Sequence, residues 1–295
     1  MLDNKNKNCL FVLYCPHLFV PLYPRMKQVK PKKNLGQHFL VDLNIAKRIA
    51  DTVDEPYQDL PVLEVGPGMG VMTQYLVKKT RPLKVVEIDR ESVAYLKATL
   101  FRDLGDGAPI IEGDFLRMDL TKVFDGQRFV LTGNYPYDIS SQIFFKMIDN
   151  RDLIPCCTGM IQHEVALRMA SKPGTKAYGI LSVLIQAWYD VEYLFMVDET
   201  VFNPPPKVKS AVIRMVRNQV QHLGCNEDLF KRVVKTAFNQ RRKMLRVSLK
   251  QMLTDEGLQL IADSPFATLR PEQLSIERFV ELTNLVGKTL CSDTK

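Results

Sequence analysis

The segment Asn134-Tyr135-Pro136-Tyr137 combines residue types that can hold and modify an aromatic amino group. Such a group is a poor nucleophile because its lone pair is delocalised into the ring. Acceptors for its two N–H bonds favour the pyramidal nitrogen that attacks a methyl donor, and we expect the Asn134 side-chain oxygen and the Tyr135 main-chain oxygen to be these acceptors. Pro136 fixes the turn, and Tyr137 can stack on a base. A simple Asn- and Pro-rich turn is the alternative.

A glycine-rich segment, Glu64 to Gly70, should bind the cofactor. Its spacing is GxGxG, whereas the dinucleotide fingerprint is GxGxxG, so the segment favours a nucleoside ligand without a pyrophosphate. Glu87, at the end of the next predicted strand, can accept the ribose hydroxyls, although this arrangement also suits NAD. Asp114 follows the third strand and can accept from an adenine amino group; capping of a turn is its alternative role.

Strand-like apolar runs alternate with amphipathic stretches, which is typical of a parallel sheet built from βαβ units. We expect an α/β domain built on a mostly parallel sheet over residues 26–220 and a small all-helical domain over residues 221–295. The predicted strands cover 61–66, 83–87, 109–111, 129–132 and 156–162, with a closing hairpin of 194–198 and 211–216. The predicted helices cover 71–79, 91–101, 230–253 and 271–285.

Residues 1–25 require separate treatment. The apolar run from Cys9 to Pro24 contains three prolines and is too short to span a bilayer, and no small-residue cleavage site follows it. We therefore expect no membrane segment. We interpret residues 1–25 as an upstream extension, with Met26 as the natural start.

Charge and cysteine usage suggest a nucleic-acid partner in a reducing compartment. The net charge is +7 and the pI is about 9.0, which favours polyanions. From Leu229 to Thr254 there is no acidic residue, and this one-signed run favours phosphate contact. Six scattered cysteines without a CxxC pattern indicate no zinc site and a cytoplasmic protein. The pair His163-Glu164 begins a zincin-like pattern, but position 167 is Leu.

Several further segments carry a resemblance to a known family. In chain order these segments are Asn34-Leu35-Gly36-Gln37-His38-Phe39-Leu40, Glu64 to Gly70, Glu87-Ile88-Asp89, Gly113-Asp114, Gly133 to Ser140, Lys176-Ala177-Tyr178-Gly179, Phe202 to Val208, and Phe238 to Lys243. In this unbroken order, from residue 30 to about 285, the chain resembles the small-subunit ribosomal RNA adenine N6-dimethyltransferases of the KsgA type.

The resemblance implies that the α/β domain is a Rossmann-like S-adenosylmethionine-dependent methyltransferase domain, followed by the small helical domain. It also implies a substrate, a cofactor and a set of site residues. The implied substrate is a pair of adjacent adenines in a hairpin near the 3′ end of 16S rRNA, dimethylated by a monomer on the assembling small ribosomal subunit. S-adenosylmethionine would be the cofactor. Its implied site is Gln37, His38, Leu40, Gly66, Gly68, Glu87, Asp114 and Asn134. The resemblance also implies that Phe202 faces Tyr137 across the target base.

Two positions depart from the family pattern, and three other functions stay open. His38 stands where relatives often have Asn, and Tyr135 stands where Leu or Ile is usual; only the backbone of Tyr135 should matter. The alternatives are a methyltransferase of large-subunit RNA, a non-catalytic assembly or transcription factor, and an NAD enzyme. Tripled Pro204-Pro205-Pro206 and the segment Lys176 to Gly179 favour the small-subunit group.

Overall fold

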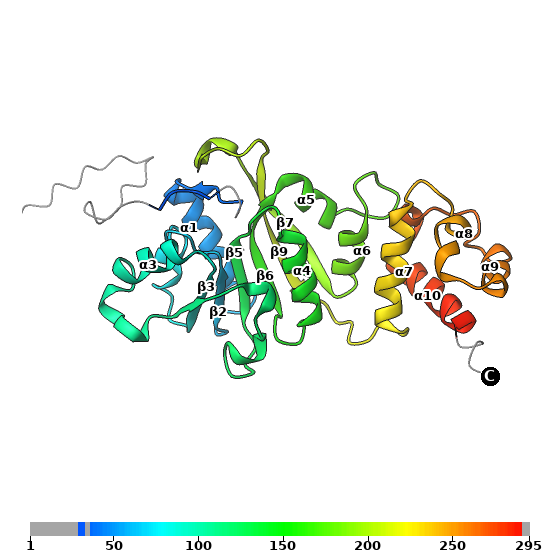
Figure 1. Ribbon diagram of the computed structural model, residues 1–295, viewed down its shortest axis with the longest axis horizontal. Helices are drawn as coiled ribbons and strands as arrows, with labels where there is room; N and C mark the ends of the chain where they lie inside the picture. Colours follow the sequence, from blue (N-terminus) through cyan, green and yellow to red (C-terminus); the bar gives the residue numbers. More distant parts are fainter. Residues whose placement is uncertain (1–28, 33–35, 291–295) are drawn as a thin grey trace, which may run out of the picture.

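The computed structural model describes residues 29–32 and 36–290 of the chain (Figure 1). The expected extension, residues 1–25, and its proposed boundary at Met26 lie outside this part. The centre of the molecule is a seven-stranded sheet with the order β4-β3-β2-β5-β6-β9-β7. Its strands are β2 (Val62–Val65), β3 (Leu83–Glu87), β4 (Ile110–Glu112), β5 (Val130–Asn134), β6 (Cys156–Gln162), β7 (Tyr189–Val197) and β9 (Ser210–Arg217).

The first five strands are parallel, and the last two close the sheet antiparallel. Strand β2 pairs with both β3 and β5, so the chain order reverses beside β2. In open α/β sheets, ligands bind at the carboxyl ends of the strands next to such a reversal. The predicted Rossmann-like methyltransferase fold, with its antiparallel closing hairpin, is confirmed.

Helices cover both faces of the sheet. On one face lie α1 (Leu43–Asp51), α2 (Thr73–Leu76) and α3 (Arg90–Ala98), which pack on Val62, Val85, Val130 and Cys156. On the other lie α4 (Ser140–Asp149), α5 (His163–Met169) and α6 (Ile180–Gln186), which pack on Leu63, Leu131, Cys157 and Ile213. Adjacent Cys156 and Cys157 are both buried, because alternate residues of a strand face opposite sides.

The C-terminal part is helical, as expected. Its helices are α7 (Glu227–Asn239), α8 (Leu245–Ser248), α9 (Asp255–Ala262) and α10 (Ile276–Leu290). The predicted single helix over 230–253 is broken after Asn239, since the next residues form a turn and the Leu245 N–H donates to the Leu269 carbonyl at 2.8 Å. The buried Trp188 ring contacts Phe230 of α7 at a centroid distance of 6.0 Å. The hydrophobic core therefore continues from the sheet into these helices.

The predicted helix over 71–79 is also shorter in the structure. Helix α2 is a single turn, because Val71 and Met72 are buried as part of the turn that follows the glycine segment. After α2, Lys79 bonds Asp54 at 2.6 Å, which ties this segment to the turn that follows α1. The length of the amphipathic stretch 71–79 had suggested a regular helix. In the structure its first residues, Val71 and Met72, line the cavity instead.

Candidate active site

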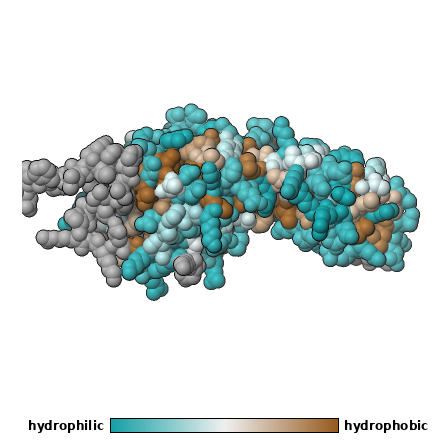
Figure 2. All heavy atoms as spheres, turned by 90° about the horizontal axis from the view of Figure 1, so that it is seen from above, coloured by the Kyte–Doolittle hydropathy of each residue, from teal (hydrophilic) through white to brown (hydrophobic). Residues whose placement is uncertain are grey.

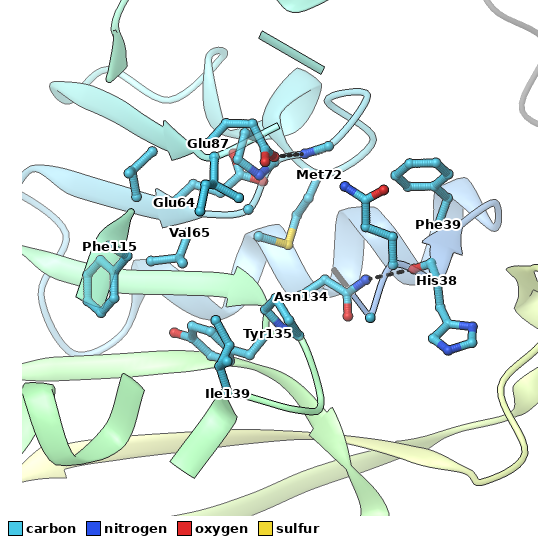
Figure 3. A pocket seen from close by; sticks show the side chains of 18 of the residues that line it. His38, Phe39, Glu64, Val65, Met72, Glu87, Phe115, Asn134, Tyr135 and Ile139 are labelled. Carbon is cyan, nitrogen blue, oxygen red and sulfur yellow. Dashed lines mark hydrogen bonds between the residues drawn. The ribbon is translucent and has the colours of Figure 1, made fainter. Parts of the chain in front are cut away.

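A cavity of about 270 Å³ opens at the carboxyl ends of β2, β3, β4 and β5 (Figure 3). All the residues expected to bind the cofactor line it, together with the Asn-Tyr-Pro-Tyr segment. These residues are Gln37, His38, Leu40, Gly66, Gly68, Glu87, Asp114, Asn134, Tyr135, Pro136 and Tyr137. The structure thus brings five segments that are distant in sequence to one place.

The glycine segment keeps the floor of the cavity open. Gly66 and Gly68 have φ values of 68° and 56°, a region that disfavours side chains. A Cβ atom at Gly66 would meet nothing within 4 Å, whereas one at Gly68 would lie 3.1 Å from the Phe39 ring. A ligand can therefore approach the Gly66 main chain directly, while Gly68 is needed for the contact with Phe39.

Glu87 is buried and oriented by main-chain donors. Its Oε2 accepts from the Gly68 N–H at 3.0 Å and its Oε1 from the Asp89 N–H at 2.9 Å. Burial raises the pKa of this carboxyl. Because each oxygen has a second lone pair, Glu87 can still accept two ligand hydroxyls, and it is held ready to do so.

Asp114 caps a turn and also lines the cavity, and its role at the adenine amino group stays a prediction. Its Oδ1 caps a turn by accepting from the Leu116 N–H at 2.9 Å, and its Oδ2 lies 3.4 Å from Arg117 Nε. The residue also lines the cavity and is half-buried. Capping fixes the direction of the side chain without using all its acceptor capacity.

Glu64 is a cavity residue to which the sequence assigned no role. Its side chain is buried, and its Oε2 has no hydrogen-bond partner in the described chain. Burial, with the Glu87 carboxylate nearby, raises its pKa to about 8. The available signal was a carboxylate at the end of an apolar strand, directly before the glycines.

The cavity wall is acidic. Among the described residues it carries the carboxyl groups of Glu64, Glu87, Asp114 and Asp138 and no Lys or Arg. A pyrophosphate would be repelled here, which speaks against NAD. S-adenosylmethionine carries a sulfonium, an ammonium and a carboxylate group, and its net positive charge fits a wall of this kind.

Asn134, the last residue of β5, is oriented by the N-terminal segment. Its Nδ2 donates to the His38 main-chain oxygen at 3.3 Å (Figure 3). Since a carbonyl can only accept, this bond identifies the amide nitrogen and leaves Oδ1 as an acceptor without a partner among the described residues. The arrangement presents an acceptor at the cavity, as the proposed chemistry requires.

The side chain of Tyr135 turns away from the cavity. It is buried, its hydroxyl donates to the Thr158 carbonyl at 3.0 Å, and its N–H donates to the Met160 carbonyl at 3.0 Å. The residue is thus held on β6 at two points. This placement agrees with the expectation that only its backbone serves the site.

Tyr137 and Phe202 differ in their placement. The Tyr137 hydroxyl bonds Ser210 Oγ at 2.6 Å, and its ring stacks on His38 at 5.7 Å. Phe202 lies in β8 (Phe202–Asn203), which pairs with β1 (Phe39–Leu40). Its side chain is buried and does not line the cavity, so its role opposite Tyr137 stays a prediction.

Comparisons with known proteins agree on one family. A model of the family described as ribosomal RNA adenine dimethylase matches residues 28–286. The chain is 66% identical, over 90% of its length, to ribosomal RNA small subunit methyltransferase A of Bacteroides fragilis, of which the match covers 95%. It is also 66% identical to the protein of the same name from Phocaeicola vulgatus, over 91% of this chain and 94% of that one.

Solved structures show the same fold. A dimethyladenosine transferase from Plasmodium falciparum aligns over 85% of this chain and 98% of its own, with a TM-score of 0.72 and 24% identity. The 23S rRNA methyltransferase ErmE aligns over 84% and 99%, with a TM-score of 0.59 and 25% identity. No helix in the described part of the chain is long and apolar enough to cross a bilayer. The chain therefore belongs to the ribosomal RNA adenine dimethylase family, the enzymes that transfer methyl groups from S-adenosylmethionine to adenines of ribosomal RNA.

Proposed function

We propose that the protein dimethylates N6 of two adjacent adenines in a hairpin near the 3′ end of 16S rRNA. The substrate would be the small ribosomal subunit late in assembly, and the enzyme would act on it as a cytoplasmic monomer. The Oδ1 of Asn134 is the observation that carries this proposal, because it offers an acceptor for an N6 hydrogen at the wall of an acidic cavity.

The residues of the chain can be assigned roles around this acceptor. Glu87 would hold the cofactor ribose, and Asp114 the amino group of its adenine, while Gly66 admits the ligand to the main chain. When bound, S-adenosylmethionine supplies a methyl group on a cationic sulfur. Asn134 and Tyr135 would accept the two N6 hydrogens and hold the target nitrogen in line with this methyl group; such positioning supplies much of the acceleration in enzymes of this kind.

The helical part of the chain, residues 221–295, would bind RNA phosphates. Seven exposed basic residues of this part form no ion pair with any described residue: Arg232, Lys235, Arg242, Lys243, Arg246, Lys250 and Arg270. Their neighbours Lys231 and Arg241 instead lie close to Asp149 and Glu272, at 2.6 and 3.8 Å. Phosphate contacts position a protein on nucleic acid without reading its sequence.

The activity is tested with labelled S-adenosylmethionine and undermethylated 30S particles. The expected product is N6,N6-dimethyladenine near the 3′ end of 16S rRNA. Label found only in 23S RNA would contradict the proposal and support the activity named for ErmE.

The role of Asn134 is tested by Asn134→Ala. Loss of a group that acts on the reacting atoms should lower kcat at least about a hundredfold, whereas binding of S-adenosylmethionine and of 30S particles should change little. Asn150→Ala is the matched control, because Asn150 Nδ2 also donates to a carbonyl, that of Lys146 at 2.8 Å, but lies outside the cavity. Unchanged turnover in Asn134→Ala would refute the assigned role.

A further inference from the structure

His38 makes three contacts that join three separate segments. Its main-chain oxygen accepts from Asn134 Nδ2 at 3.3 Å. Its Nδ1 lies 2.9 Å from the Pro204 carbonyl. Its ring stacks on Tyr137, with the centroids 5.7 Å apart and the planes 26° from parallel.

The contact with Pro204 fixes the tautomer and extends a strand pair. A carbonyl can only accept, so Nδ1 carries the hydrogen. Phe39 and Asn203 are partners in the β1–β8 pair, and His38 and Pro204 occupy the next position on either strand. The imidazole N–H therefore supplies a cross-strand bond at the end of a ladder that is only two residues long.

The imidazole does not point towards the ribose end of the cavity. In Figure 3 it projects away from Glu87, beyond the bond between its own main chain and Asn134. The main chain of His38 thus contacts Asn134 of the expected cofactor site, while its ring lies against Tyr137.

Tyr137 is held from two directions by these contacts. Its hydroxyl bonds Ser210 Oγ at 2.6 Å, and Ser210 is itself buried at the start of β9. The His38 ring supports one face, and the tether to Pro204 holds the His38 ring in place. A stacking platform that is fixed before a base arrives loses less entropy on binding than a mobile one.

We propose that His38 is a positioning residue of the target-base site. Its side chain fixes the Tyr137 ring and links that ring to the loop Pro204-Pro205-Pro206. The sequence had placed His38 in the cofactor site. The proposal rests on the proposed function, because it takes Tyr137 to be the platform for the adenine.

The test separates the two sides of the site. His38→Ala should raise KM for undermethylated 30S particles about tenfold, within the range expected for lost stacking, and should change the Kd of S-adenosylmethionine less than about threefold. His38→Phe keeps a ring beside Tyr137 and should recover most of the affinity for the particles. Thermal unfolding of each variant checks that the fold is intact.

His163→Ala is the matched control. It removes a second histidine–tyrosine pair, in which His163 Nδ1 lies 3.0 Å from the Tyr193 hydroxyl, and it leaves the cavity wall intact. Neither constant should change in this variant.

Two results would overturn the proposal. A tenfold weaker Kd for S-adenosylmethionine in His38→Ala, with an unchanged KM for particles, would place the imidazole on the cofactor; unchanged values of both would remove any role. Failure of the proposed function is recognised separately, since the wild-type protein would then form no dimethyladenine in the same assay.

Discussion

Tyr135 lines the cavity, and its side chain is bound to β6. Tyr135→Phe keeps the ring but leaves the Thr158 carbonyl without its 3.0 Å donor. We expect the free energy of unfolding to fall by about 1–3 kcal/mol, the usual cost of an unsatisfied buried group, and kcat to fall as well, because the catalytic turn is less firmly held. Urea unfolding and steady-state kinetics measure the two effects.

Tyr189→Phe gives the comparison for this variant. The Tyr189 hydroxyl also donates to a buried carbonyl, that of Ile154 at 2.8 Å, but it lies at the other end of the sheet. Tyr189→Phe should lower the free energy of unfolding by a similar amount and leave kcat unchanged. Equal kcat in the two variants would show that Tyr135 acts on stability alone.

Glu64 should make stability depend on pH. Its pKa rises from the ordinary value of 4.5 to about 8 on folding, so between these values the folded protein keeps a proton that the unfolded chain has lost. The free energy of unfolding contributed by this group therefore falls as the pH rises from about 5 to about 8. Glu64→Gln stays uncharged and should lose this part of the pH dependence.

Urea unfolding of both proteins at pH 6 and pH 8, without cofactor, measures the difference. The wild type should lose more stability between the two pH values than Glu64→Gln. An equal loss in both proteins would mean that Glu64 does not carry a proton at pH 6.

At the level of single residues, the sequence predicted most of the cavity wall. Asn134, Glu87 and Asp114 were found because each lies at or just after the end of a strand, and strand ends meet at one edge of a parallel sheet. Glu64 is also a carboxylate at the end of an apolar strand, but no group of the cofactor or substrate was assigned to it. The placement of Phe202 could not be predicted, because it depends on a two-residue strand pair with Leu40.

Among the elements, the buried strands were the most predictable. The bounds of β3 and β6 agree with the prediction, since strands covered on both faces are continuous apolar runs. Strand β7 begins at Tyr189, earlier than predicted. The prediction missed its first residues because exposed Asp190 and Glu192 interrupt the apolar pattern. Pairs as short as β1–β8 have no periodicity to detect.

Two glycines allow β5 and β6 to approach closely beside the Asn134 to Tyr137 turn. Gly133 and Gly159 are partners in the sheet, and Gly159 has a φ of 148°. A Cβ atom at Gly159 would lie 2.3 Å from the Gly133 oxygen and 2.7 Å from the Tyr135 ring. Gly159→Ala should therefore destabilise the protein by about 2–5 kcal/mol or prevent folding.

Soluble yield and thermal unfolding measure this effect. Gly107→Ala is the control, because a Cβ atom there meets nothing within 4 Å and its φ is not positive. Similar stability of the two variants would contradict the expected clash.

At the scale of the whole molecule, the helical part is joined to the sheet by core contacts and by charge. Trp188 packs on Phe230, and Arg151 bonds Glu227 at 2.7 Å. The sequence indicated that strand patterns give way to helical ones near residue 226. It did not indicate the shared core, because apolar periodicity shows that a helix face is buried but not which element covers it.

The exposed basic residues should control affinity for the substrate particle. Figure 2 shows a mainly hydrophilic surface over the helical end of the molecule, on the face that it presents. Replacing Arg242, Lys243 and Arg246 with Gln should weaken binding to 30S particles. It should also reduce the slope of log affinity against log salt by about 0.7–0.9 for each RNA phosphate that the variant no longer neutralises. Filter binding over a series of salt concentrations measures this slope.

Lys97→Gln serves as the control, since Lys97 is exposed on α3, away from the helical end (Figure 1). It should leave the slope unchanged. A triple variant with the wild-type slope would exclude these residues from phosphate binding.

The acidic wall of the cavity also bears on turnover. A methyl donor with a sulfonium becomes an uncharged thioether once the methyl group has left, and carboxylates attract the cation more strongly than the neutral product. Glu87 and Asp114 would therefore favour exchange of spent cofactor for fresh cofactor. An enzyme that adds several methyl groups to its substrate needs one such exchange between each transfer and the next.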